Sequence, residues 1–401
     1  MHVPDEMPPL SFDPTWTYQE RIGFSARLRE TQPVSQVQMP GYGRAWIVTR
    51  YADVRAALAG SRLARDVHRW PGGSRTRPSE ATGIYAHMLH SDPPDHTRLR
   101  RLVQKAFAPR RAALRPRAEQ IARELLDELA ADPCGTIDLL DRYARPLPIR
   151  VLCELLGIPA ADRAWMAATV TAYDERGEHQ RVERELAAYF TGLAAKRAKR
   201  AEPGDDLVSA LVLARTDDGT GGLTGDELIS TVFLLVMAGF DTTVNLIASG
   251  TLALLTHPEQ MARLRADPAL LPAAVEELLR FTSPVNHVND RFTAEDVTVG
   301  GVVIAAGEWV FPMISSADRD AAQFPDPDRL DLGRDTSGQV AFGHGIHHCL
   351  GAPLARMEAE VAFGALLPRF PGLSLAVPAA ELRWRPVGLM NGLVSLPARL
   401  A

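Results

Sequence analysis

Three histidines and one cysteine lie between glycines in the stretch FGHGIHHCLG, residues 342–351. Imidazole nitrogens and a thiolate are metal ligands, so these residue types allow a metal centre. Three interpretations compete: a turn with solvated histidines and an inert thiol, a zinc site, and a site with one thiolate ligand. Structural zinc sites usually combine two separated ligand pairs, and the rest of the sequence supplies no second pair. The chemistry therefore depends on what Cys349 can do alone.

Cys349 directly precedes a helix-like segment, APLARMEAEVAFGALL, whose Pro353 suits a first helical turn. Free backbone N–H groups and the helix dipole at such a position stabilise a thiolate. The flanking glycines let the backbone approach a flat cofactor. A single thiolate in such a turn is expected for haem iron that cleaves an O–O bond.

The stretch resembles the F-x-x-G-x-H-x-C-x-G signature of the cytochrome P-450 family, a haem-thiolate monooxygenase family. The matching positions are Phe342, Gly345, His347, Cys349 and Gly351. The resemblance implies heme b as cofactor and Cys349 as its iron ligand. It also implies that Phe342, Gly343, His347 and Gly351 belong to the cofactor site.

The segment AGFDTT, Ala238–Thr243, is similar to the oxygen-binding segment of that family. The small residues Ala238 and Gly239 leave room for dioxygen beside a helix. Thr242 can hydrogen-bond the oxygen ligand or an ordered water, and Asp241 can relay protons, a role worth roughly 10²- to 10⁴-fold in rate. The alternative is that both threonines bond back to the preceding helical turn while Asp241 is solvated.

The pair Glu277 and Arg280 in EELLRFTSPV matches the E-x-x-R motif of the family. By itself this spacing is typical of an ordinary surface ion pair. The segment FPDPDRLD places Arg329 where the family completes a Glu–Arg–Arg network. In the resemblance this network is structural and supports the cysteine loop.

His96 and Arg100 in SDPPDHTRLRRLV share one helix face, so both can reach one anion. In the family these positions bind a haem propionate, and Arg291 and His347 are similarly placed. Burying the two haem carboxylates requires such cationic partners.

The same segment gathers Arg98, Arg101, Lys105, Arg110 and Arg111. A solvated basic face, a docking surface for an acidic electron donor and a nucleic-acid surface are the alternatives. The chain has no flavin or iron–sulfur motif, so the resemblance implies a separate ferredoxin and ferredoxin reductase. A net charge of −5 gives no global basic field, and we expect no nucleic-acid partner.

By analogy with the family, the substrate pocket is mostly apolar with a few polar groups, as small-molecule sites usually are. Simple core packing is the alternative for each residue. The candidates are Ile84, Met88, Leu89, Leu234, Met237, Ala238, Val285, His287, Val288, Asn289 and Met390.

The predicted function is insertion of one oxygen atom from O2, by hydroxylation or epoxidation, into a hydrophobic small molecule such as a polyketide or macrolide intermediate. The alternatives are a haem-thiolate enzyme with peroxide-driven, C–C coupling or isomerase chemistry, a non-catalytic haem sensor, and a zinc hydrolase.

Helical patterns must position most of these residues. Residues 93–108 place their apolar side chains on one stripe of a helix. A helix of about thirty residues opens with a capping box from Thr224 to Glu227 and stops at His257-Pro258. Polar residues at its centre would be costly in lipid, so we expect it inside the protein and expect no membrane association.

Short β-like pieces occupy residues about 35–50 and 285–312 and the C-terminal segment. The predicted fold is mainly α: one cytochrome P-450 domain over residues 1–401, with a small β-rich portion and a long central helix over the haem. The three cysteines show no paired spacing and the N-terminus lacks a signal-peptide pattern, so we expect a cytoplasmic protein.

Overall fold

The computed structural model describes residues 10–11, 16–39, 42–71, 83–132, 135–175, 178–200, 202, 204–217, 219, 221–288 and 291–400. Helices dominate this part of the chain, as the sequence predicts. The helices are α1 (Tyr18–Thr31), α2 (Tyr51–Ala59), α3 (Asp95–Ala112), α4 (Arg115–Ala130), α5 (Pro146–Leu156), α6 (Arg163–Glu175), α7 (His179–Ala198), α8 (Leu207–Leu213), α9 (Gly225–Thr256), α10 (Pro258–Ala266), α11 (Leu271–Thr282), α12 (Ile314–Ala317) and α13 (Ala352–Arg369).

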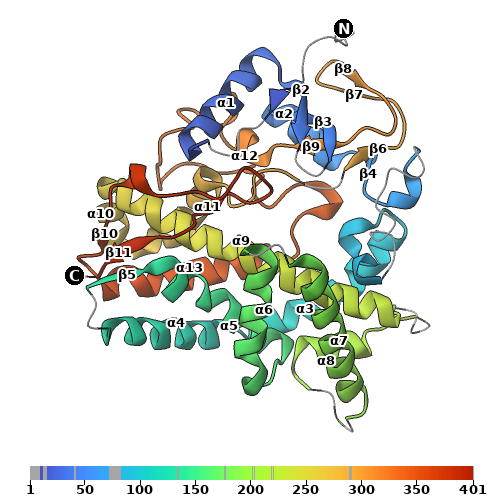
Figure 1. Ribbon diagram of the computed structural model, residues 1–401, viewed down its shortest axis with the longest axis horizontal. Coiled ribbons are helices and arrows are strands. Elements are labelled where there is room, and N and C mark those ends of the chain that lie inside the picture. Colours follow the sequence, from blue (N-terminus) through green and yellow to red (C-terminus); the bar gives the residue numbers. More distant parts are fainter. Residues whose placement is uncertain are drawn as a thin grey trace.

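The strands are short and form small sheets. They are β1 (Leu10–Ser11), β2 (Val34–Met39), β3 (Gly43–Val48), β4 (Leu63–Ala64), β5 (Thr136–Asp138), β6 (Phe292–Thr293), β7 (Val297–Val299), β8 (Val302–Ile304), β9 (Val310–Pro312), β10 (Ser374–Leu375) and β11 (Pro397–Arg399). The largest sheet has the order β1-β2-β3-β9, in which β2 and β3 form an antiparallel hairpin and β9 joins β3 in parallel. Figure 1 shows β2, β3 and β9 together beside α1 and α2, so both predicted β segments meet in one sheet.

The hairpin of β7 and β8 turns at Gly300 and Gly301, with φ of 55° and 82°. Both residues adopt the left-handed region, which only glycine enters freely, so the Gly-Gly pair fixes this turn.

Helix α9 crosses the centre of the molecule (Figure 1) and packs against α5, α7, α11 and α13. It begins with the predicted capping box, in which Thr224 and Glu227 bond each other's backbone, and its C-cap is His257. By length and composition α9 could cross a membrane, but 72% of its most apolar window is buried inside the protein. The prediction of a core helix is confirmed.

Helix α3 buries the predicted apolar stripe, and the stripe packs into the main hydrophobic core. Helix α13 follows the cysteine loop directly and packs against α4, α9 and α11. These helices fix the two ends of the candidate site: α9 carries AGFDTT, and α13 begins three residues after Cys349.

Candidate active site

The loop before α13 is a tight turn held by its own backbone. The N–H of Cys349 donates to the carbonyl of Phe342 at 2.9 Å, which closes the loop. Gly343 and Gly345 have φ of 72° and 78°. A Cβ atom on Gly345 would lie 2.8 Å from the carbonyl oxygen of Leu58, so glycine is also required there by close packing. The guanidinium of Arg356 lies over the ring of Phe342, 4.6 Å from its centroid.

Cys349 has accessible surface, yet the surrounding protein desolvates its sulfur and raises the pKa of the thiol. The backbone N–H groups of Gly351 and Ala352, and the charges of Arg100 and Arg356, act in the opposite direction. The expected donors at the start of α13 are therefore present, but desolvation outweighs them. A thiolate here needs a cation beside the sulfur, and an iron ion supplies that charge.

The middle of α9 exposes a narrow strip of its surface. Ala238 is exposed, and Met237, Gly239 and Thr242 are half-buried, on a helix whose other residues in this region are mostly buried. The hydroxyl of Thr242 donates to the carbonyl of Ala238 at 2.8 Å. The oxygen of that hydroxyl keeps its lone pairs for a further donor.

Asp241 is not solvated. Arg385 binds both carboxylate oxygens, with Nη1 donating to Oδ2 at 3.0 Å and Nη2 donating to Oδ1 at 3.1 Å. The side-chain amide of Asn245 also donates to Oδ2, at 3.2 Å. This bidentate ion pair ties α9 to the C-terminal segment and fixes the direction of the carboxylate.

Five basic side chains form a second group, which we call the cation cluster: Arg65, His96, Arg100, Arg291 and His347. The rings of His96 and His347 are 4.3 Å apart between centroids. Arg100 donates through Nη2 to the carbonyl of His348 at 2.6 Å. The cluster thus joins α3, the cysteine loop and the segments before β6 and after β4.

The cation cluster is poorly compensated by the protein. Burial and the neighbouring cations hold the pKa of His347 well below its usual range, and burial lowers the pKa of Arg291 to about 9. Asp92 is the carboxylate that acts on both His96 and Arg291, and it already forms a 2.8 Å ion pair with Arg69.

Among the described residues, both ring nitrogens of His96 and the Nε of Arg291 have no hydrogen-bond partner. A buried guanidinium and buried imidazole nitrogens in this condition require hydrogen-bonding partners from outside the protein, and the guanidinium requires an anion. The two carboxylates at the edge of a haem fit this requirement.

A third group of charges, the Glu277 network, joins α11 to the chain between Asp318 and Arg334. Glu277 and Arg280 are fully buried and form a bidentate pair at 2.7 and 2.8 Å. The prediction that Arg329 completes this network is wrong. Arg329 is exposed and contributes only its carbonyl, whereas Nε of Arg334 donates to Glu277 at 3.2 Å. The backbone turns at Asp326, and the carbonyl of Asp326 accepts a hydrogen bond from Nη2 of Arg334, five residues after Arg329.

The candidate substrate residues lie in four segments. The 3-10 turns Gly83–Tyr85 and Met88–His90 bring Ile84, Met88 and Leu89 into the same apolar cluster as Leu234 and Met237 of α9. Val285 and Met390 pair in an isolated antiparallel bridge. His287 is buried and Val288 is half-buried in the segment after α11. Asn289 lies outside the described residues.

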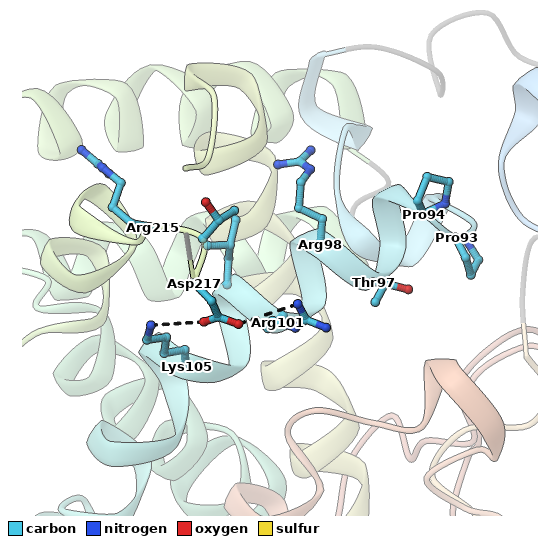
Figure 2. Close-up of a pocket in the computed structure, with 10 residues that line it drawn as sticks. Pro93, Pro94, Thr97, Arg98, Arg101, Lys105, Arg215 and Asp217 are labelled. Atoms are coloured by element: carbon cyan, nitrogen blue, oxygen red, sulfur yellow. Dashed lines mark ion pairs between the residues drawn. The ribbon is translucent and has the colours of Figure 1, made fainter. Parts of the chain in front are cut away.

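Three basic residues of α3 form ion pairs with acids from elsewhere in the chain. Arg98 forms an ion pair with Glu227 of α9. Figure 2 shows Asp217 between Arg101 and Lys105, at 3.7 and 3.5 Å. Arg101 and Lys105 also line a shallow surface hollow, together with Gln104 and the exposed Ile346 of the cysteine loop.

Several residues of these groups escaped prediction from the sequence. Arg65, Arg334 and Arg385 belong to no motif in the printed sequence, and only the fold brings them to their partners. Glu358 carried a readable signal, because it lies on the buried face of α13 with Leu354 and Val361. Burial raises the pKa of this carboxyl well above its ordinary value.

Comparisons with known proteins agree with this geometry. The cytochrome P450 family profile matches residues 171–374. Cytochrome P450 107B1 of Saccharopolyspora erythraea is 47% identical, with 97% of each chain covered. The 6-deoxyerythronolide B hydroxylase of the same organism is 45% identical and covers 94% of this chain and 95% of its own.

Mycinamicin IV hydroxylase/epoxidase of Micromonospora griseorubida is 46% identical, with 94% of each chain covered. Among solved structures, the ligand-free P450 monooxygenase TamI superposes with a TM-score of 0.88 at 44% identity, covering 98% of this chain and 94% of that one. The chain therefore belongs to the cytochrome P450 family and is a bacterial haem-thiolate monooxygenase.

Proposed function

We propose that this protein hydroxylates or epoxidises an uncharged, largely apolar small molecule of the polyketide or macrolide class. The similarity over nearly the whole chain to enzymes named for 6-deoxyerythronolide B and mycinamicin IV carries this proposal. The expected lining of the pocket is compatible with such a substrate, because it is mainly apolar with a polar group. The apolar residues are Ile84, Leu234, Met237 and Val285, and the polar residue is His287.

The cofactor in this proposal is heme b, held by Cys349 through its iron. The cation cluster would bind its two carboxylates, and Phe342, Gly343 and Gly351 would form the turn beneath it. When bound, the haem supplies the redox centre at which dioxygen is activated.

Asp241 and Thr242 are proposed to deliver protons in this reaction. Arg385 occupies one lone pair on each oxygen of Asp241, which leaves a lone pair of Oδ1 to exchange a proton with a neighbouring donor. Arg385 is then a positioning residue that holds Asp241 in place between turnovers. Ala238 and Gly239 would leave space for dioxygen beside α9.

The electron source is proposed to be a ferredoxin with its reductase. The supporting observation is the basic surface of α3 around Arg101 and Lys105, next to the exposed Ile346. An apolar contact inside a basic rim suits an acidic electron-transfer protein. We further propose that the chain acts in the cytoplasm as one P450 domain over residues 1–401.

The experiment has two steps. Reduced, haem-loaded protein under carbon monoxide must first show the red-shifted Soret band of a thiolate-ligated haem, and Cys349→Ser must lose it. Titration with 6-deoxyerythronolide B, mycinamicin IV and non-macrolide terpenoids should then shift the haem from low to high spin with the macrolides alone. Products formed under ¹⁸O₂ should contain one labelled oxygen atom; unlabelled product would overturn the monooxygenase chemistry.

Two adjacent threonines offer a matched pair for the proton-delivery proposal. Thr242 and Thr243 both bond back to the preceding turn, but Thr243 is buried. We expect Thr242→Val to divert electrons from product to peroxide and Thr243→Val to leave the yield of product per electron pair unchanged. Equal yields in both variants would contradict the role of Thr242.

A further inference from the structure

Arg101 and Lys105 of α3 form a ridge between two surface hollows. On one side lies the hollow that includes Ile346 of the cysteine loop, and on the other side lies a hollow of about 560 Å³ bordered by residues 215–217. Both basic side chains are 67% exposed, and the two residues are one helical turn apart. Each cation can therefore pair with a carboxylate that comes from either side.

The carboxylate that meets them from within the chain belongs to Asp217. Its Oδ2 lies 3.7 Å from Nη1 of Arg101, and its Oδ1 lies 3.5 Å from Nζ of Lys105, so each oxygen faces one cation (Figure 2). The backbone beside Asp217 is closed on itself. The N–H of Thr216 donates to the carbonyl of Gly221 at 2.9 Å, and the N–H of Gly221 donates back to the Thr216 hydroxyl at 2.9 Å. These bonds hold the Asp217 carboxylate beside α3.

The two ion pairs of Asp217 can be exchanged for others. Asp217 is 66% exposed, and ion pairs between exposed side chains contribute little to stability because water screens them. A carboxylate of another protein can replace Asp217, and exclusion of water at the interface strengthens the new pair. Arg98 differs, because its partner Glu227 is only 15% exposed and also caps α9. Arg98 therefore belongs to the fold, whereas Arg101 and Lys105 are available to a partner.

We propose that Asp217 is an internal competitor of the electron donor. Its carboxylate neutralises Arg101 and Lys105 until a carboxylate of the donor displaces it. This inference rests on the proposed function, in which an acidic ferredoxin docks on α3 beside Ile346. Attraction between opposite charges increases the rate at which such proteins meet, so Asp217 slows docking of the donor.

The test measures the rate of electron transfer to the haem. Haem-loaded protein under carbon monoxide is mixed with a photochemically reduced, acidic plant-type [2Fe–2S] ferredoxin, and the red-shifted Soret band reports reduction. Asp217→Asn removes the charge and keeps the shape of the side chain, so the second-order rate constant should rise about threefold at low salt. The gain should disappear at about 1 M salt, where the Debye length is about 3 Å. A rate constant equal to that of the native chain at low salt would overturn the proposal.

Asp127 provides the matched control. It is 73% exposed and pairs at 3.3 Å with Arg369, the last residue of α13, about 25 Å along that helix from the cysteine loop. Asp127→Asn changes the net charge by the same amount but removes no partner of α3, so it should leave the rate constant nearly unchanged. Equal acceleration by Asp127→Asn and Asp217→Asn would show a general effect of net charge and overturn the proposal.

The cations of α3 distinguish this inference from the docking proposal on which it rests. The double variant Arg101→Gln/Lys105→Gln should slow reduction at least threefold, and Asp217→Asn added to it should bring no further change. If the double variant is slow but Asp217→Asn alone matches the native chain, the donor docks on α3 and only the competitor role fails. If the double variant is reduced as fast as the native chain, the donor docks elsewhere and both proposals fail. Matching melting temperatures of the variants establish that each is folded.

Discussion

The Glu277 network and the cation cluster are both buried, both rich in arginine, and yet built in opposite ways. In the Glu277 network the charges of Arg280 and Arg334 meet one carboxylate, and backbone carbonyls accept the remaining N–H groups of Arg280. In the cation cluster, Arg291 and His96 lie near other basic side chains, and Arg291 donates at 3.4 Å to the carbonyls of Ala57 and Leu58. Its Nε and both ring nitrogens of His96 have no partner among the described residues.

This difference indicates that the Glu277 network has a structural role and that the cation cluster has a ligand-binding role. A buried charge network closed by the protein itself is complete before any ligand binds. A buried group of like charges raises the free energy of the haem-free protein until anions enter. The same residue type therefore stabilises the fold in one region and binds a ligand in the other.

The largest expected effect on stability comes from removing the carboxylate of the Glu277 network. Glu277→Gln leaves the buried guanidiniums of Arg280 and Arg334 without a counter-charge, and should lower the free energy of unfolding by about 3–5 kcal/mol. Urea unfolding of haem-free and haem-loaded protein measures this. The control is Glu276→Gln, which loosens a partly exposed pair with Arg356 and should cost about 1 kcal/mol or less. Similar losses in both variants would contradict the account.

Removing a cation from the cation cluster should have the opposite effect: the haem-free protein should keep its stability, and haem binding should weaken. Arg291→Leu relieves repulsion, so the haem-free protein should unfold at an equal or higher urea concentration. Haem affinity should fall by about 2–4 kcal/mol because a buried partner of a carboxylate is lost. Haem transfer to apomyoglobin measures the second effect. A variant that is unstable without haem but binds haem normally would assign Arg291 to the fold instead.

A smaller effect distinguishes Arg334, which binds Glu277 in the structure, from Arg329, which the sequence predicted in that role. Arg334→Gln should cost about 1–3 kcal/mol in unfolding free energy, because Arg334 binds a buried carboxylate. Arg329→Gln should cost less than about 0.5 kcal/mol, because its side chain is exposed. Chemical denaturation of the two variants side by side distinguishes them, and the opposite ranking would restore Arg329.

The smallest expected effect is on the pH dependence of the haem-free protein. Burial and the charge of Arg100 lower the pKa of His96 below its ordinary value of 6.5. Near pH 6.5 the unfolded chain binds more protons at His96 than the folded chain does, so stability falls as the pH falls, by less than about 1.4 kcal/mol per pH unit. His96→Phe should flatten this slope between pH 6.5 and 5 in urea titrations. An unchanged slope would show that His96 is protonated in the folded chain.

Local patterns in the sequence predicted much of this molecule, because short-range physics decides them. The capping box at Thr224 and the first turn of α13 with Pro353 each depend on neighbouring residues. The residues around Cys349 and around Asp241 were also recognisable in the sequence as motifs.

The missing partners depend on long-range packing. Arg385 reaches Asp241 across 144 positions of sequence, and Arg65 joins the cation cluster from the end of β4. Nothing in the local sequence marks either arginine. Arg329 and Arg334 lie in the same meander, and the local sequence does not distinguish which of them faces Glu277.

The most direct test of the open cluster compares haem with its dimethyl ester, in which both carboxylates are uncharged. We expect the haem-free native protein to bind haem at least tenfold more tightly than the ester, and we expect this preference nearly to disappear in Arg291→Leu. Equal affinity of the native protein for haem and ester would show that the cation cluster does not bind the haem carboxylates.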